Sequence, residues 1–379
     1  MPWQEVSTVK LRKEFIVFAT REDANISELC RRFRISRTTA YKWLRRVRKE
    51  GDASLEDRSR RPLRSPGRTA EHIEQCILEV RRQHPAWGAR KIRSFLLREG
   101  MRMPAPSTVH AILHRNGCIA RHAPGAPLGR FEHDTPNAQW QMDFKGKTRL
   151  GNGAWAHPLS ILDDHSRFCV LLRACEGETH DIVKPLLEEA FRLYGLPHSI
   201  YADNGPPWAS SMQGQWTRLG VWLLKLGVRL ILGRPYHPQG RGKIERFHRS
   251  MKAEALSMRA LQDIRQADAV LREWRHVYNF QRPHEALDMR TPSQLYQPSP
   301  RPFPEKLPEV SYEEGEIVRK VLSGKGYISF RGRLWRMPDA FRGELVAIRP
   351  TNVDGRYKIC FGAFPIAEID LSKAQENAT

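Results

Sequence analysis

The hydrophobic pattern of this chain changes its period twice, and this restricts the possible folds more than any other feature. From residue 8 to 118, apolar residues recur at the spacing of amphipathic helices. From 135 onward, strand-like alternation comes first and then alternates with helical segments, which is typical of an α/β layer fold. From 309 to 371, short β-rich pieces separated by Gly, Asp and Asn turns suit a small barrel. We therefore predict a multidomain protein with an all-α part, an α/β core and a small all-β barrel.

Polar and Pro-rich stretches between these regions mark the predicted domain boundaries. In order, we predict a helical domain over 1–50, a basic linker over 51–68, a second helical domain over 69–118, a linker over 119–134, an α/β core over 135–297, a Pro-rich hinge over 298–308, a small β-barrel over 309–371 and a disordered tail over 372–379.

The two N-terminal regions each have the pattern of a helix-turn-helix unit. In the first, Asn25 and Ser36 are placed to cap the second and third helices, and the third helix exposes Arg, Thr and Lys side chains, which fits a DNA major groove. A plain three-helix bundle with a charged face is the alternative. The second region repeats the theme, so we predict tandem helix-turn-helix domains. The candidate DNA-binding side chains are Arg37, Thr38, Thr39 and Lys42, with Arg45 and Arg46 facing phosphates, and Thr108 and Arg115 in the second unit.

Composition narrows the class of partner. The formal net charge is +21, and such an excess favours a polyanion, nucleic acid first, over a surface of merely solvated Lys and Arg. The six cysteines include no C-x-x-C pair, which argues against zinc and against a disulfide framework. No apolar run approaches the roughly 20 residues of a membrane span, and no signal peptide is evident. We therefore expect a cytoplasmic protein without a membrane partner.

Residues 234–251 begin as an irregular Pro/Gly segment and continue as a helix with one acid, Glu245. That acid stands among cations, which are Arg241, Lys243, Arg246, Arg249 and Lys252. A lone carboxylate in such a field can neutralise its neighbours through salt bridges. It can also be a metal ligand on a surface that holds phosphate. The sequence of this segment alone leaves both readings open.

Two further acids favour the metal-ligand reading. Asp143 lies within the first predicted strand of the core, and Asp203 ends a later strand, where α/β sheets place their sites. Two carboxylates on adjacent strands and Glu245 on a facing helix can converge on a pair of divalent ions, which would bind the attacking and leaving oxygens of a phosphodiester displacement. Taken singly, each acid has a structural alternative: a strand Asp, a turn and a salt bridge. Asp163 and Asp164 are rival acids, and their turn position favours a structural role.

Together with their flanking residues, these acids resemble a known family. The motifs are Trp140–Asp143, Asp203–Gly205 and His237–Arg246, and they are similar to the catalytic core of DDE transposases and retroviral-type integrases. The transposases of bacterial insertion sequences are the closer match, because they also carry tandem helix-turn-helix modules, an Asp-Asp-His-Ser-Arg turn and an Asn-x-x-Arg-Pro-His segment. Here those two segments are 163–167 and 279–284.

The resemblance implies an RNase H-like core in which Asp143, Asp203 and Glu245 bind two Mg²⁺ ions, with Mn²⁺ as a substitute and no zinc. It implies that water first cuts at the ends of the element and that the freed 3′-hydroxyl then attacks target DNA. The implied partners are double-stranded transposon-end and target DNA and, when DNA is bound, at least a second copy of the chain, in the bacterial cytoplasm at the nucleoid. The further DNA contacts are Arg241, Lys243, Arg246 and Arg249.

The chain departs from the family pattern in two places. The 41 residues between Asp203 and Glu245 exceed the usual spacing, and Arg241 stands where many relatives have Asn. Two other functions remain open from sequence: a catalytically silent helix-turn-helix regulator derived from a transposase, and a nuclease without strand transfer. The terminal repeats, the target preference and the fate of the second strand are not encoded in any motif that we recognise.

Overall fold

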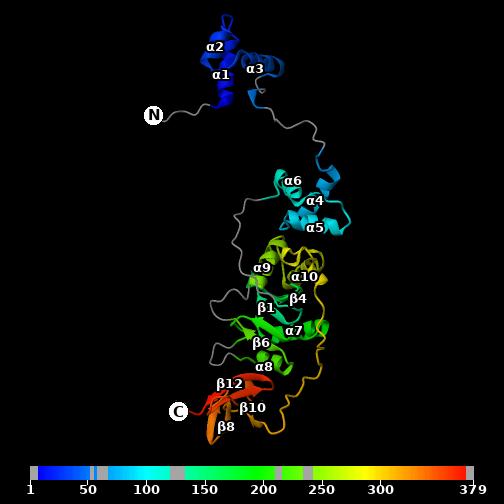
Figure 1. The fold of residues 1–379 in the computed structure, drawn as a ribbon, viewed down its shortest axis with the longest axis vertical. Coiled ribbons are helices and arrows are strands. Elements are labelled where there is room, and N and C mark those ends of the chain that lie inside the picture. Colours follow the sequence, from blue (N-terminus) through cyan, green and yellow to red (C-terminus); the bar gives the residue numbers. More distant parts are fainter. Residues whose placement is uncertain are drawn as a thin grey trace. The chain divides into compact units, whose positions relative to one another are not determined.

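The computed structural model describes residues 7–51, 55–57, 67–119, 133–209, 216–233 and 242–372. It divides into two compact units, Met1–Arg68 and Thr69–Thr379 (Figure 1). The predicted division of the second unit into separate domains stays a prediction. No helix in these ranges is long and apolar enough to cross a membrane.

The first unit is a three-helix domain made of α1 (Thr8–Ala19), α2 (Ile26–Arg32) and α3 (Arg37–Glu50). The predicted caps are confirmed, because the side chain of Asn25 accepts from the first turn of α2 and that of Ser36 accepts from Thr39 N of α3. The core forms around Phe15 and Ala40, and it includes Trp43, which the periodicity analysis did not select.

The second unit begins with the three helices that the sequence predicts there. They are α4 (Glu71–Gln83), α5 (Ala89–Arg98) and α6 (Pro106–Arg115). Ile77 of α4, Ile92 of α5 and Val109 of α6 are fully buried around Trp87, which lies in the turn before α5. Helical spacing therefore located all three apolar faces correctly.

The centre of the second unit is a mixed six-stranded sheet. Its strands are β1 (Gln139–Phe144), β2 (Thr148–Arg149), β3 (Trp155–Asp163), β4 (Cys169–Cys175), β5 (Ser199–Ala202) and β6 (Arg229–Leu232). The order is β2-β3-β1-β5-β6, and β4 pairs with β3. The pairs of β3 with β1, β2 and β4 are antiparallel, whereas β1, β5 and β6 are mutually parallel. The predicted antiparallel start and the later strand–helix alternation are both confirmed.

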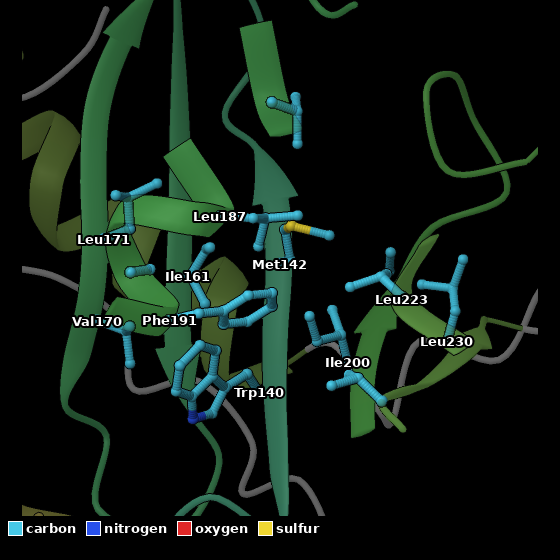
Figure 2. Packing of buried hydrophobic residues seen from close by; sticks show 14 of the residues in the cluster. Trp140, Met142, Ile161, Val170, Leu171, Leu187, Phe191, Ile200, Leu223 and Leu230 are labelled. Carbon is cyan, nitrogen blue, oxygen red and sulfur yellow. The ribbon is translucent and has the colours of Figure 1, made fainter. Parts of the chain in front are cut away.

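Helices cover both faces of this sheet. Trp140 and Met142 of β1 point toward α7 (His180–Tyr194), whose Leu187 and Phe191 pack on them (Figure 2). The helix α8 (Arg218–Lys225) packs in the same cluster. The opposite face carries α9 (Gly242–Met251) and α10 (Ile264–His276), each continued by one π-helical turn, Lys252–Leu256 and Val277–Gln281. Because side chains alternate along a strand, Gln141 and Asp143 face the α9 side.

The C-terminal region contains every β segment that the sequence predicts. The strands are β7 (Ile317–Lys320), β8 (Tyr327–Phe330), β9 (Arg333–Arg336), β10 (Leu345–Pro350), β11 (Arg356–Phe361) and β12 (Phe364–Asp370). The predicted closed barrel is not confirmed: in the described residues the strands form an open four-stranded sheet, β12-β11-β10-β7, and a separate β8-β9 hairpin. Turn spacing marks strands, but closure depends on which edges pair and with what shear, which the spacing does not contain.

Candidate active site

Asp143 and Asp203 share one face of the sheet at the same level. The parallel register of β1 with β5 runs from Gln139↔Ser199 to Gln141↔Tyr201. Asp143 stands two residues further along β1, and Asp203 is the first residue after β5. Ile200 and Ala202 belong to the α7 cluster, so Asp203 follows on the α9 side, as Asp143 does. Adjacent strands lie about 4.8 Å apart. The pairing therefore brings both acids to the carboxyl ends of neighbouring parallel strands.

The loop after β5 holds Asp203 at the edge of the sheet. Its Oδ1 accepts a hydrogen bond from Gly205 N at 3.1 Å, and Asn204 Nδ2 donates to Gly233 O at 2.6 Å, which ties the loop to the end of β6. A Cβ on Gly205 would lie 3.4 Å from Oδ1 of Asp203, which is ordinary van der Waals contact. Asp203 is half-buried.

Asp143 lies deeper and is contacted from α9. Its residue is only 7% exposed. Its main-chain oxygen accepts from Ser160 Oγ at 3.1 Å, and its Oδ2 lies 3.8 Å from Nδ1 of His248. His248 Nε2 is in turn 2.6 Å from Ser160 Oγ. The first acid is therefore connected to β3 and to α9 through one polar network.

The helix α9 carries Glu245 on its exposed side. Ile244, Phe247, His248 and Met251 are buried, and Glu245 is exposed together with Arg246 and Arg249. The helix packs on β1, and Glu245 precedes His248 by one turn. Residues three apart on a helix are surface neighbours, so Glu245 lies beside the residue that contacts Asp143.

The donor set suits a hard divalent cation, but the three acids are not gathered into one site. Carboxylate oxygens are the ligands that Mg²⁺ prefers, and Asp143 and Asp203 fit such an ion as an aligned pair. Within the described ranges, no three His, Cys, Asp or Glu side chains lie close enough to hold a metal. The structure thus brings the two aspartates to one face and leaves Glu245 on the adjoining helix.

The rival acids have structural partners. Asp163 accepts from Asn137 N at 2.7 Å, Ser166 N at 2.8 Å and Ser166 Oγ at 2.6 Å, and burial raises the pKa of its carboxyl. Asp164 accepts from Gln141 Nε2 at 2.8 Å and Lys243 Nζ at 2.6 Å. Both carboxylates therefore hold the β3–β4 turn against its neighbours.

The candidate DNA contacts of the first unit lie along α3. Arg37, Thr38, Lys42 and Arg45 are exposed. Thr39 is half-buried, and its amide and hydroxyl bond to Ser36 Oγ at the helix start. The guanidinium of Arg46 stacks over Trp43 and donates to Glu56 O at 3.0 Å. Four of these six side chains are therefore exposed, and Arg37, which donates to Ser27 Oγ, also has a partner within the domain, as Thr39 and Arg46 do.

The candidates of the second unit are similarly divided. Thr108 is half-buried on α6, and Arg115 forms an ion pair with Glu74 of α4. The ammonium of Lys243 is engaged by Asp164, whereas Arg246 and Arg249 are exposed. Arg241 and His237 lie outside the described residues.

Sequence reasoning missed His248 and Ser160. His248 follows Glu245 by one helical turn in a segment already read as a helix, so this spacing was the available signal. Ser160 had none, because its role depends on the pairing Asp143↔Ser160 across β1 and β3.

Models of known families match the chain from one region to the next. Two integrase core domain models match 133–238 and 226–292. A helix-turn-helix domain matches 12–62, and a homeodomain-like domain matches 39–113. The C-terminal domain of IS481 family transposases matches 316–377.

Two bacterial relatives are similar over most of the chain. The insertion element IS407 uncharacterized 31.7 kDa protein of Burkholderia multivorans is 27% identical over 286 residues, which is 73% of this chain and 93% of that protein. The insertion element IS476 uncharacterized 39.2 kDa protein of Xanthomonas euvesicatoria is 27% identical over 62% of this chain and 66% of that protein. A simian T-cell lymphotropic virus intasome structure in complex with PP2A regulatory subunit B56 gamma aligns with 78% of this chain and 95% of that chain, at 17% identity and a TM-score of 0.40.

The order of these matches along the chain agrees with the order of domains that the sequence predicts: DNA-binding modules, an integrase core and a transposase C-terminal domain. The chain belongs to the transposases of bacterial insertion sequences that carry a core of the retroviral-integrase type.

Proposed function

We propose that this transposase cuts and joins DNA at the ends of its own insertion element, with Asp143, Asp203 and Glu245 as the catalytic residues. The observation that carries the proposal is the register of β1 with β5, which aligns the two aspartates on the face that α9 covers. The integrase core matches over 133–292 support the same residues, because all three acids fall within them.

The proposed chemistry has two displacements at phosphorus. In the first, water attacks a phosphodiester at the element's end, the bond from phosphorus to the 3′-oxygen breaks, and that oxygen takes up a proton. In the second, the resulting 3′-hydroxyl attacks a target phosphodiester and displaces the target's own 3′-oxygen, so one phosphodiester replaces another. When bound, Mg²⁺ or Mn²⁺, two ions per site, would activate the attacking oxygen and stabilise the leaving one.

The residues have separate tasks in this proposal. Asp143 and Asp203 would hold the cations at the end of the sheet, where the ions would supply charge to the phosphate oxygens. Glu245 would complete the site from α9, although the three carboxylates do not form one ligand group among the described residues. Arg246 and Arg249, exposed on the same helix, would contact the DNA backbone.

DNA recognition is assigned to the helix-turn-helix modules. Exposed Thr38 and Lys42 on α3 would reach base edges, and Arg45 would contact phosphate. Holding two element ends together calls for at least a dimer, and a DNA-binding protein of a bacterial insertion sequence would act at the nucleoid in the cytoplasm.

The test is a strand-transfer assay with labelled DNA from the sequences that flank the gene. The wild-type chain with Mg²⁺ should release a 3′-hydroxyl and form joined products, and Asp203→Asn and Glu245→Gln should do neither while still binding the DNA. Joining by Asp203→Asn at the wild-type rate would refute the assignment. Cuts without joined products would identify a nuclease instead.

A silent DNA-binding regulator is the second candidate. The observation in its favour is that no three ligands are gathered at one site within the described ranges. If the protein is such a regulator, the wild-type chain will bind end DNA with an affinity that falls with salt concentration. It will give no cut or joined product with either Mg²⁺ or Mn²⁺.

A further inference from the structure

Two side chains of α9 reach the sheet on either side of Glu245. Lys243 donates from Nζ to Oδ2 of Asp164 at 2.6 Å and to its main-chain oxygen at 3.1 Å. His248 lies 2.6 Å from Ser160 Oγ through Nε2. Glu245 stands two residues after the first anchor and three before the second, so it lies on the stretch of helix between them.

Ser160 joins Asp143 and His248 in the second anchor. Its hydroxyl donates to the main-chain oxygen of Asp143 at 3.1 Å. Its Oγ also lies 2.6 Å from Nε2 of His248, in a hydrogen bond whose donor is set by the tautomer of the imidazole. The other ring nitrogen, Nδ1, faces the carboxylate of Asp143.

The network of Asp143, Ser160 and His248 is buried, so the loss of any of its hydrogen bonds destabilises the fold. Ser160, His248 and Asp143 are 0%, 6% and 7% exposed. A buried polar group is stable only when its hydrogen bonds are made, and an apolar residue at 248 would pack against Phe247 and its neighbours without that requirement. Packing alone therefore does not account for a histidine at this position.

We propose that His248 and Lys243 are positioning residues that clamp α9 onto the sheet and so set the place of Glu245 relative to Asp143. His248 couples the helix to Asp143 itself, through Ser160 and directly. Lys243 anchors the first turn of the helix to the β3–β4 turn. This inference rests on the proposed function for its catalytic consequence, but the clamp can be tested without catalysis.

Substitutions at His248 and Ser160 distinguish the contact made by Nε2 from the contact made by Nδ1. His248→Ala removes both contacts, and Ser160→Ala removes the hydroxyl that links them. His248→Gln places an amide N–H near the position of Nε2 and so can still donate to Ser160. His276→Ala is the matched control, because His276 is an exposed histidine on α10.

The first measurement is hydrogen–deuterium exchange of the peptide covering 242–251 in the full chain. His248→Ala and Lys243→Met should each raise its exchange, His248→Gln should restore most of the protection, and His276→Ala should leave it unchanged. Ser160→Ala combined with His248→Ala should raise the exchange by less than the sum of the two single effects, because the bond between Ser160 and His248 is lost in both.

The second measurement is strand transfer as a function of Mg²⁺ concentration. Residues that orient metal ligands typically change metal affinity or activity by about 10- to 100-fold, so His248→Ala should shift the Mg²⁺ midpoint by that order while DNA affinity stays constant. His248→Gln should recover most of the shift.

Unchanged exchange over 242–251 in His248→Ala would overturn the clamp. So would a His248→Gln variant that is no better than His248→Ala in both measurements. If the wild-type chain gives no strand transfer, the proposed function fails, and the exchange experiment still decides whether α9 is clamped.

Discussion

Asn279 supports a quantitative prediction of stability, because its side-chain amide makes the two hydrogen bonds to β4 that a neighbouring strand would otherwise make. It is 1% exposed and lies in the π-helical turn that follows α10. Its Oδ1 accepts from Cys169 N at 2.8 Å, and its Nδ2 donates to Cys169 O at 3.0 Å. Cys169 opens β4, which pairs only with β3 in the described sheet. The amide therefore satisfies both backbone groups on the free side of that strand.

The cost of Asn279→Ala follows from these two bonds. The Cys169 N–H would be left buried without an acceptor, which costs about 1–3 kcal/mol. The Cys169 carbonyl would keep a second donor, Arg275 Nε at 2.9 Å, so its loss is that of one ordinary hydrogen bond, about 0.5–1.5 kcal/mol. Together the variant should lose roughly 2–4 kcal/mol of the free energy of unfolding.

Urea denaturation of the full chain, followed by tryptophan fluorescence, measures this loss as a lower midpoint with an unchanged slope. Asn352→Ala is the matched control, because Asn352 is exposed in the turn between β10 and β11 and should change stability by less than about 0.5 kcal/mol. If Asn279→Ala also changed the free energy of unfolding by less than about 0.5 kcal/mol, the proposed role of its amide in pairing with β4 would be refuted.

Three further predictions follow from buried groups and from charge. Glu254→Ala would leave the buried Arg282 guanidinium without the carboxylate that now lies 3.0 Å away, and urea denaturation should show a loss of about 3–5 kcal/mol, most of it recovered by Glu254→Leu with Arg282→Met. Burial, with the charge of Arg282 nearby, lowers the pKa of His284 well below 6.5, so the fold keeps it neutral. The unfolded chain gains that proton first as the pH falls through about 6.5, so stability should decrease from pH 7 to 5 by up to about 1.4 kcal/mol per unit, a slope that thermal unfolding should find flattened in His284→Gln. Affinity for end DNA should fall steeply with salt in a filter-binding assay, and Lys42→Ala should weaken specific more than nonspecific binding; a flat salt response would contradict the basic surfaces.

The bounds of most elements could be read from the sequence because they depend on local period. The strand predicted to end at Asp203 is β5, and the helix predicted to carry Glu245 is α9. Apolar spacing is set by the geometry of the element itself, 3.6 residues per turn or alternation of two, and needs no knowledge of distant neighbours.

Pairing between distant segments decided the rest. The motifs predict that Asp143 and Asp203 lie on adjacent strands, and β1 and β5 are indeed neighbours, but their common level and face come from the register. Lys243 reads as a DNA contact in sequence, whereas in the fold its ammonium is held by Asp164, 79 residues away along the chain. A partner that far away leaves no local signal.

The sequence by itself determined most of the helices and strands and identified the family, because period, spacing and motifs are local. The roles of the three acids stay a prediction. Tertiary structure decided that the C-terminal sheets stay open, that Asn279 and Asp163 serve the fold, and that His248 joins α9 to Asp143. Each of these depends on which edges and side chains meet after the chain has folded, and the free energy of those contacts belongs to pairs of residues that the linear sequence does not place together.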